Sequence, residues 1–161
     1  HYVATARAHE KLSDSYSDLA VKALGYLGQV GGGEAIDSFA AARSREIERR
    51  YASTVREAGH DPRLRAQALA DALTADGYAA TVREIGGGGF AVQLCQGHFP
   101  IRQVAGDFPQ LCEAETAAFS RLLNVHVQRL ATLAGGEHVC TTHIPVATPV
   151  ISPAARAALR K

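Results

Sequence analysis

The sequence has no Met and no Trp among its 161 residues, and it has only three Cys. It also has no apolar run near the roughly 20 residues that a membrane-spanning helix needs, and no succession of basic, apolar and small residues marks a secretion signal. We therefore expect a cytoplasmic protein with no membrane partner. In a reducing cytosol, a few thiols are more often metal-binding, reactive or buried than paired in disulfides.

The sequence has no large excess of positive or negative charge, because its 17 Lys and Arg residues are nearly balanced by 16 Asp and Glu residues. No segment has the dense basic run of a phosphate-binding surface. The most basic stretch, from Arg43 to Arg50, also contains Glu46 and Glu48, which is typical of a solvated or partner-facing helix. These 161 residues alone are therefore not expected to bind duplex DNA specifically.

Two helical patterns occupy the N-terminal part of the chain. The first runs from Ser13 to Leu27 and the second from about Glu34 to Ala58, and Gly28 with Gly31–Gly33 predicts a break between them. Apolar stripes of this kind on a small protein require cover, so we expect a homodimer built on both helices. The stripes are Tyr16, Leu19, Ala20, Ala23, Leu24 and Leu27 in the first helix, and Ile36, Phe39, Ala40, Ile47, Tyr51 and Val55 in the second.

The remainder reads as a small unit of mixed helices and strands. Asp61-Pro62 is a strong helix start, and four consecutive glycines between two β-prone runs indicate a hairpin rather than a phosphate loop, because no Lys-Ser/Thr follows them. The fold class is therefore α+β: two long N-terminal helices, then helix, β-hairpin, helix and β-hairpin. The predicted elements are helices at 62–76, 101–105 and 109–123 and strands at 78–85, 90–95, 125–133 and 138–144.

The three cysteines, Cys95, Cys112 and Cys140, are dispersed along this second unit. None belongs to a C-x-x-C pair, which excludes zinc-ribbon and two-cluster ferredoxin patterns. Cys112 is expected in the first turn of a helix, where backbone N–H groups favour thiolate over thiol. Residue types alone favour cysteines that serve as small buried hydrophobes.

Three segments around these cysteines resemble the C-terminal sensor region of SufR-type iron-sulfur-responsive repressors. The resemblance covers most of the chain, because the first residues look like the last strand of that family's winged helix and the first predicted helix looks like its dimer helix. The matching segments are Cys95–Ile101, Phe108–Glu115 and Val139–Pro145, supported by Ser120–Leu123, His126–Thr132, Tyr2–Thr5 and Tyr16–Leu27.

The resemblance implies a homodimeric transcriptional repressor and not an enzyme. In the family, a preceding winged helix-turn-helix domain binds duplex operator DNA, and an iron-sulfur cluster held by three cysteines, expected as 4Fe-4S, controls repression of cluster-assembly genes. A chain that opens without Met fits the loss of such a domain. The implied division is the end of a winged-helix domain and linker in 1–12, a dimerisation region in 13–60, a sensor domain in 61–145 and a flexible tail in 146–161.

Two of the three family ligands carry over directly, as Cys112 and Cys140. The third family cysteine stands immediately before Pro100, where this sequence has Phe99, a side chain that cannot ligate iron. We expect Cys95 to replace it. Two alternatives stay open: an imidazole completes the set, or the site has been lost, with Phe99 filling the cavity and the cluster absent. The candidate histidines are His98 first, then His126 and His143.

Two other classes of function compete with this interpretation. In the first, the α+β unit is a regulatory domain that encloses an apolar small molecule, and its cysteines are structural. In the second, Cys112 forms a nucleophile–base pair with His126 or His143. No glycine turn of the oxyanion-hole type adjoins Cys112, so catalysis is not expected.

Overall fold

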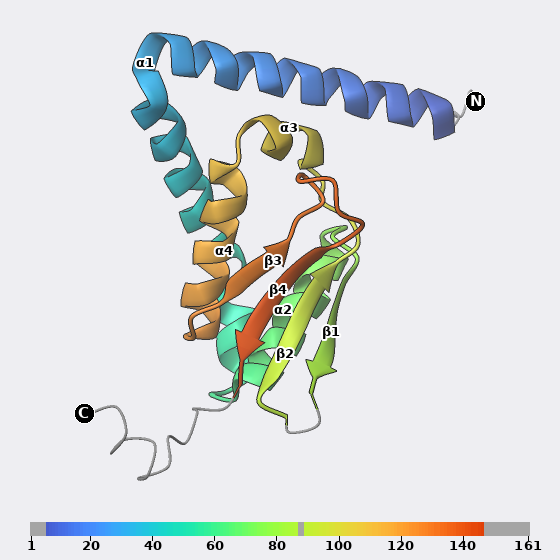
Figure 1. The fold of residues 1–161 in the computed structure, drawn as a ribbon, viewed down its shortest axis with the longest axis vertical. Coiled ribbons are helices and arrows are strands. Elements are labelled where there is room, and N and C mark those ends of the chain that lie inside the picture. Colours follow the sequence, from blue (N-terminus) through green and yellow to red (C-terminus); the bar gives the residue numbers. More distant parts are fainter. Residues whose placement is uncertain (1–5, 87–88, 147–161) are drawn as a thin grey trace, which may run out of the picture.

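The computed structural model describes residues 6–86 and 89–146, with side chains from Ser15 onward. Four strands form one antiparallel sheet, and helices α2 and α4 lie behind it in the view of Figure 1. This arrangement confirms the predicted α+β class. The elements are α1 (Ala6–Glu57), α2 (Pro62–Ala75), β1 (Ala80–Ile85), β2 (Ala91–Gln96), α3 (Arg102–Asp107), α4 (Gln110–Leu123), β3 (Gln128–Ala131) and β4 (Cys140–Pro145).

Several predicted features fall outside the described residues. These are the strand-like Tyr2–Thr5, the middle of the glycine turn at 87–88, and residues 147–161 of the expected tail. Among the described residues, none of the helices contains an apolar stretch of the length that a membrane span requires.

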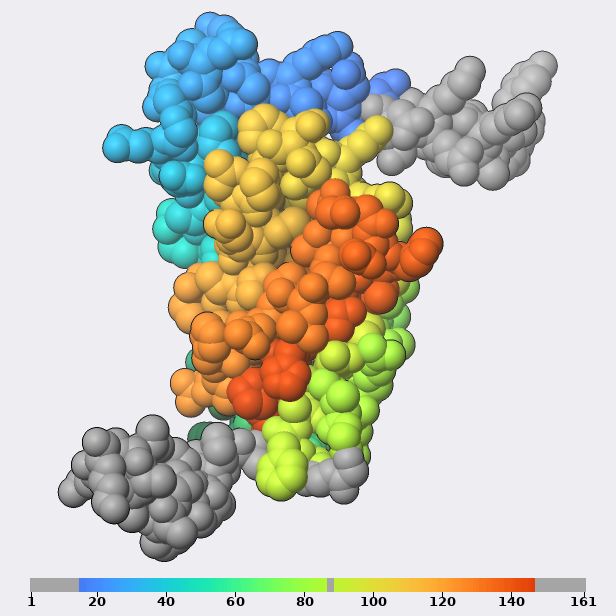
Figure 2. Space-filling model, in the orientation of Figure 1, coloured from blue at the N-terminus to red at the C-terminus, as the bar shows by residue number. Residues whose placement is uncertain are grey.

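Helix α1 is bent into two segments at a single glycine. The backbone of Gly32 has φ 69° and ψ −173°, a combination that only glycine adopts without strain. The break predicted at Gly28 and Gly31–Gly33 is thus located at Gly32, and the helix continues through Gly28. The bend turns the first segment across one end of the molecule, beside α3 (Figures 1 and 2).

The second segment of α1 packs inside the chain, against α2 and α4. Tyr51 and Val55 are buried, and the Tyr51 hydroxyl donates to the Asp76 carboxylate at the end of α2 (2.6 Å). The Ser44 hydroxyl donates to the Ala114 carbonyl of α4 (2.9 Å). The expectation that this second stripe forms a dimer face is therefore wrong for its buried part, because the chain itself covers it.

The first segment divides its apolar residues between two faces. Leu24 is buried, and Ala20, Val21 and Leu27 pack against the core. Another set projects outward, and each of these residues is 64–70% exposed: Tyr16, Leu19, Tyr26 and Val30. The single stripe predicted from the sequence is thus two stripes, and among residues 6–86 and 89–146 nothing covers the second one.

The strand order is β1-β2-β4-β3, so the two predicted hairpins join through β2 and β4. Gln96 pairs with Cys140, Leu94 with Thr142 and Val92 with Ile144. Paired residues of antiparallel strands point to the same face, and all six are nearly or fully buried. This face is the one that the helices cover.

Candidate functional site

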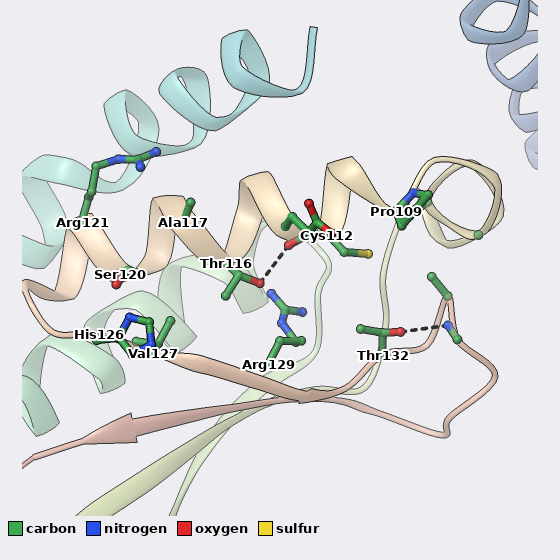
Figure 3. A pocket seen from close by; sticks show the side chains of 15 residues that line it. Pro109, Cys112, Thr116, Ala117, Ser120, Arg121, His126, Val127, Arg129 and Thr132 are labelled. Atoms are coloured by element: carbon green, nitrogen blue, oxygen red, sulfur yellow. Dashed lines mark hydrogen bonds between the residues drawn. The ribbon is translucent and has the colours of Figure 1, made fainter. Parts of the chain in front are cut away.

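Cys112 lies in the first turn of α4, as the sequence predicts. It is buried, and Figure 3 shows its side chain reaching from α4 into a cavity. Burial raises the pKa of the Cys112 thiol to about 11, although the positive charge of Arg129 acts in the opposite direction. Burial therefore acts against the thiolate form that a helix N-terminus favours.

Cys140 is the first residue of β4 and is fully buried on the covered face of the sheet. Its sulfur accepts a hydrogen bond from the Leu133 backbone N–H (3.2 Å). The charge of a Cys140 thiolate would also raise the pKa of Cys112, so the two sulfurs lie within electrostatic reach of one another. The fold thus brings together the two cysteines that match the family pattern.

Cys95 lies on the opposite face of the sheet. It pairs with Thr81 of β1 and Thr141 of β4, whereas its neighbour Gln96 pairs with Cys140 on the covered face. Successive side chains of a strand alternate between faces. Cys95 is therefore separated from Cys112 and Cys140 by the sheet, and the expected three-cysteine set is not assembled in this structure.

The three candidate histidines do not join the two cysteines either. His98 is exposed after β2, and His143 pairs with Gln93 on the uncovered face. His126 lines the same cavity as Cys112 but stands at the other end of it (Figure 3). Among residues 6–86 and 89–146, no three or more His, Cys, Asp or Glu side chains are grouped so that they could hold a metal ion.

Phe99 stands where the resemblance to SufR-type repressors implies a third cysteine. Its ring is buried, and the centroid of the ring lies 6.3 Å from the centroid of the Tyr78 ring. A buried phenyl ring stabilises the core and offers iron no ligand atom. The residues present supply two thiols on one side of the sheet and do not complete a set of three.

A cavity of about 740 Å³ lies beside Cys112, between α4 and β3 with the connection that follows β3 (Figure 3). Its walls combine small apolar side chains with a few polar ones. The lining residues are Ala105, Gly106, Pro109, Cys112, Glu113, Thr116, Ala117, Ser120, Arg121, His126, Val127, Arg129, Thr132, Ala134 and Gly135.

A buried polar cluster forms the floor between this cavity and the sheet. Arg129 of β3 forms an ion pair with Glu115 of α4 (N–O 2.8 Å) and donates to the Gln96 side-chain oxygen (3.3 Å). Its guanidinium also lies 5.7 Å from the centre of the Phe119 ring. Three side-chain atoms of this region are buried without a hydrogen-bond partner: Arg129 Nε, Gln96 Nε2 and Thr142 Oγ1.

The sequence analysis missed this cluster. Its one signal was Glu115, a carboxylate at a position of α4 that shares the helical spacing of Leu111, Phe119 and Leu122. A buried acid requires a cationic partner, but the sequence does not show that the partner is Arg129.

Comparisons with protein-family models, curated proteins and solved structures find no match to this chain. The resemblance to SufR-type repressors therefore depends on the sequence motifs quoted above.

Proposed function

We propose that this chain is the sensor and dimerisation domain of an iron-sulfur-responsive transcriptional repressor of cluster-assembly genes. Cys112 and Cys140 are its two cluster ligands. The observation that carries this proposal is that Cys112 in the first turn of α4 and Cys140 on the covered face of the sheet are both buried, and that a charge on Cys140 would act on the Cys112 thiol. They are also the two that match the family pattern.

The proposed cluster site lacks its third thiolate, because Phe99 stands at that position and Cys95 faces the other side of the sheet. An iron-sulfur cluster would supply sensitivity to iron and oxidants. Thiolates are its usual protein ligands, so this chain should hold a cluster less firmly than a variant with a cysteine at position 99.

Helix α4 links the cysteine site to α1. Besides the Ser44 hydrogen bond, Arg121 of α4 forms an ion pair with Glu48 of α1 (2.6 Å). A change at Cys112, in the first turn of α4, can therefore reach α1 through a packed pair of helices. In the proposed repressor, α1 follows the domain that binds duplex operator DNA, and the dimer geometry sets the spacing of the two half-sites.

The uncovered stripe of α1 is the proposed homodimer face. Tyr16, Leu19, Ala23, Tyr26 and Val30 are exposed and recur at intervals of three and four residues, which is the pattern of a coiled-coil seam. This refines the expectation from the sequence, because the seam lies on the first segment of α1 alone.

Sedimentation velocity tests the dimer. The chain should sediment as a dimer at tens of micromolar, and Leu19→Glu should shift it to monomer by placing a charge in the seam. Gln29→Glu, an exposed change on the same segment but outside the stripe, should leave the dimer intact. A wild-type monomer at these concentrations would contradict the proposed interface.

Iron and acid-labile sulfide analysis after anaerobic purification tests the cluster site. Phe99→Cys should bind more iron per chain than wild type, with stronger visible absorption, whereas Phe99→Leu should not. In the Phe99→Cys background, Cys112→Ser or Cys140→Ser should abolish the gain, and Cys95→Ser should leave it unchanged. Equal iron in Phe99→Cys and Phe99→Leu would refute the proposed site.

A further inference from the structure

We propose that the cavity between α4 and β3 binds a small organic acid, with its carboxylate at Arg129 and its apolar body along α4. This site goes beyond the proposed function, because it requires no cluster, although Cys112 contributes to one wall. It assigns a second kind of effector to the same domain.

Arg129 supplies the recognition group. Its side chain is only 9% exposed, it lines the cavity, and Figure 3 shows it rising from β3 toward α4. Its Nε–H is buried without a partner. A buried donor that lacks an acceptor is costly, and an arginine edge matches the two oxygens of a carboxylate.

The charges around the cavity favour an anion. Glu115, which pairs with Arg129, is not among the lining residues, so the cavity meets the cationic partner and not the acidic one. His126 stands at the other end, and the Arg121 guanidinium points away from the cavity to its ion pair with Glu48 of α1 (Figure 3). Glu113 is the only carboxylate among the lining residues, and it is exposed.

The shape and the remaining walls favour an apolar body on that anion. A volume of about 740 Å³ lies within the usual range of small-molecule sites, about 300–1,000 Å³. Ala117 of α4 and Val127, which comes just before β3, are among the apolar lining residues, and Ala105, Pro109 and Ala134 line the end near Cys112. Such walls match a short aliphatic or aromatic chain better than a sugar or a nucleotide.

Isothermal titration with octanoate and 1-octanol tests the site, since the two probes share a chain and differ in charge. Wild type should bind octanoate with a saturable isotherm, at least tenfold more tightly than 1-octanol. Glu115→Gln should strengthen octanoate binding, because it removes the carboxylate that competes for Arg129. Glu115→Gln with Arg129→Gln keeps the buried pair neutral and should reduce octanoate to the affinity of 1-octanol.

Two further variants separate this site from the cluster site. Thr116→Phe, at a lining residue that points toward Arg129 (Figure 3), should fill the cavity and abolish binding of both probes, with the fold checked by circular dichroism. Cys140→Ser, at a residue that does not line the cavity, should lose iron but keep octanoate binding. Loss of octanoate binding in this cysteine variant, absence of saturation at millimolar octanoate, or unchanged affinity in the Glu115→Gln/Arg129→Gln variant would each overturn the proposal.

Discussion

Arg129→Met should destabilise the fold by about 3–5 kcal/mol, because it leaves the Glu115 carboxylate buried without its cation. The two side chains are 9% and 3% exposed and their charged atoms lie 2.8 Å apart. The substitution also removes the cation above the Phe119 ring. The free energy of unfolding of a domain is only about 5–15 kcal/mol, so this one substitution removes a large share of it. At about 2–4 °C per kcal/mol, the melting temperature should fall by about 10 °C.

Urea unfolding followed by circular dichroism measures this loss, and two variants serve as controls. Glu115→Leu combined with Arg129→Met leaves no unpaired charge, so it should cost less than Arg129→Met alone. Arg121→Met breaks the ion pair with Glu48, whose side chains are 53% and 27% exposed, and should cost less than about 1 kcal/mol. A decrease of less than about 1 kcal/mol in the free energy of unfolding for Arg129→Met would refute the reasoning. Simple additivity of the effects of Glu115→Leu and Arg129→Met in the double variant would also refute it.

Gly32→Ala should lower the free energy of unfolding by about 1–3 kcal/mol in thermal unfolding, because the backbone angles of Gly32 strain any other residue. Gly33→Ala should be neutral or stabilising, because a methyl group there meets open space. Equal stability of the two variants would contradict the bend assigned to Gly32. The rate of alkylation of Cys112 by iodoacetamide, followed by mass spectrometry, should be low at pH 8 and increase toward pH 11, because burial raises the pKa of this thiol. A rate that reaches its plateau by pH 9 would indicate a thiol of ordinary pKa. The Asp76 carboxylate accepts hydrogen bonds from Arg50 and Tyr51, which lower its pKa from 3.8 to about 2. Its contribution to stability is therefore present above pH 4 and lost as pH falls through 2, and its NMR titration midpoint should rise in Arg50→Gln.

The order of the elements could be predicted because it depends on local pattern. Asp61-Pro62 starts α2 as expected, with the Asp61 carboxylate accepting from the Arg63 N–H. The two hairpins also form where the β-prone runs lie. Strand ends were predicted less well, since β3 spans only Gln128–Ala131 and has an irregularity after Arg129. Hydrophobic periodicity reports the direction of side chains along an element and not the extent of its pairing.

Local sequence pattern predicts the α+β class, the break in α1 to within a few glycines, and the position of Cys112 in the first turn of a helix. The face on which each side chain lies depends on how distant parts of the chain pack together. The β2–β4 register separates Cys95 from Cys140, and the bend at Gly32 buries Tyr51 while it leaves Tyr26 exposed. Strand register and helix packing join residues that are distant in the chain, so a shift of one residue would exchange the faces of the sheet without changing any local pattern.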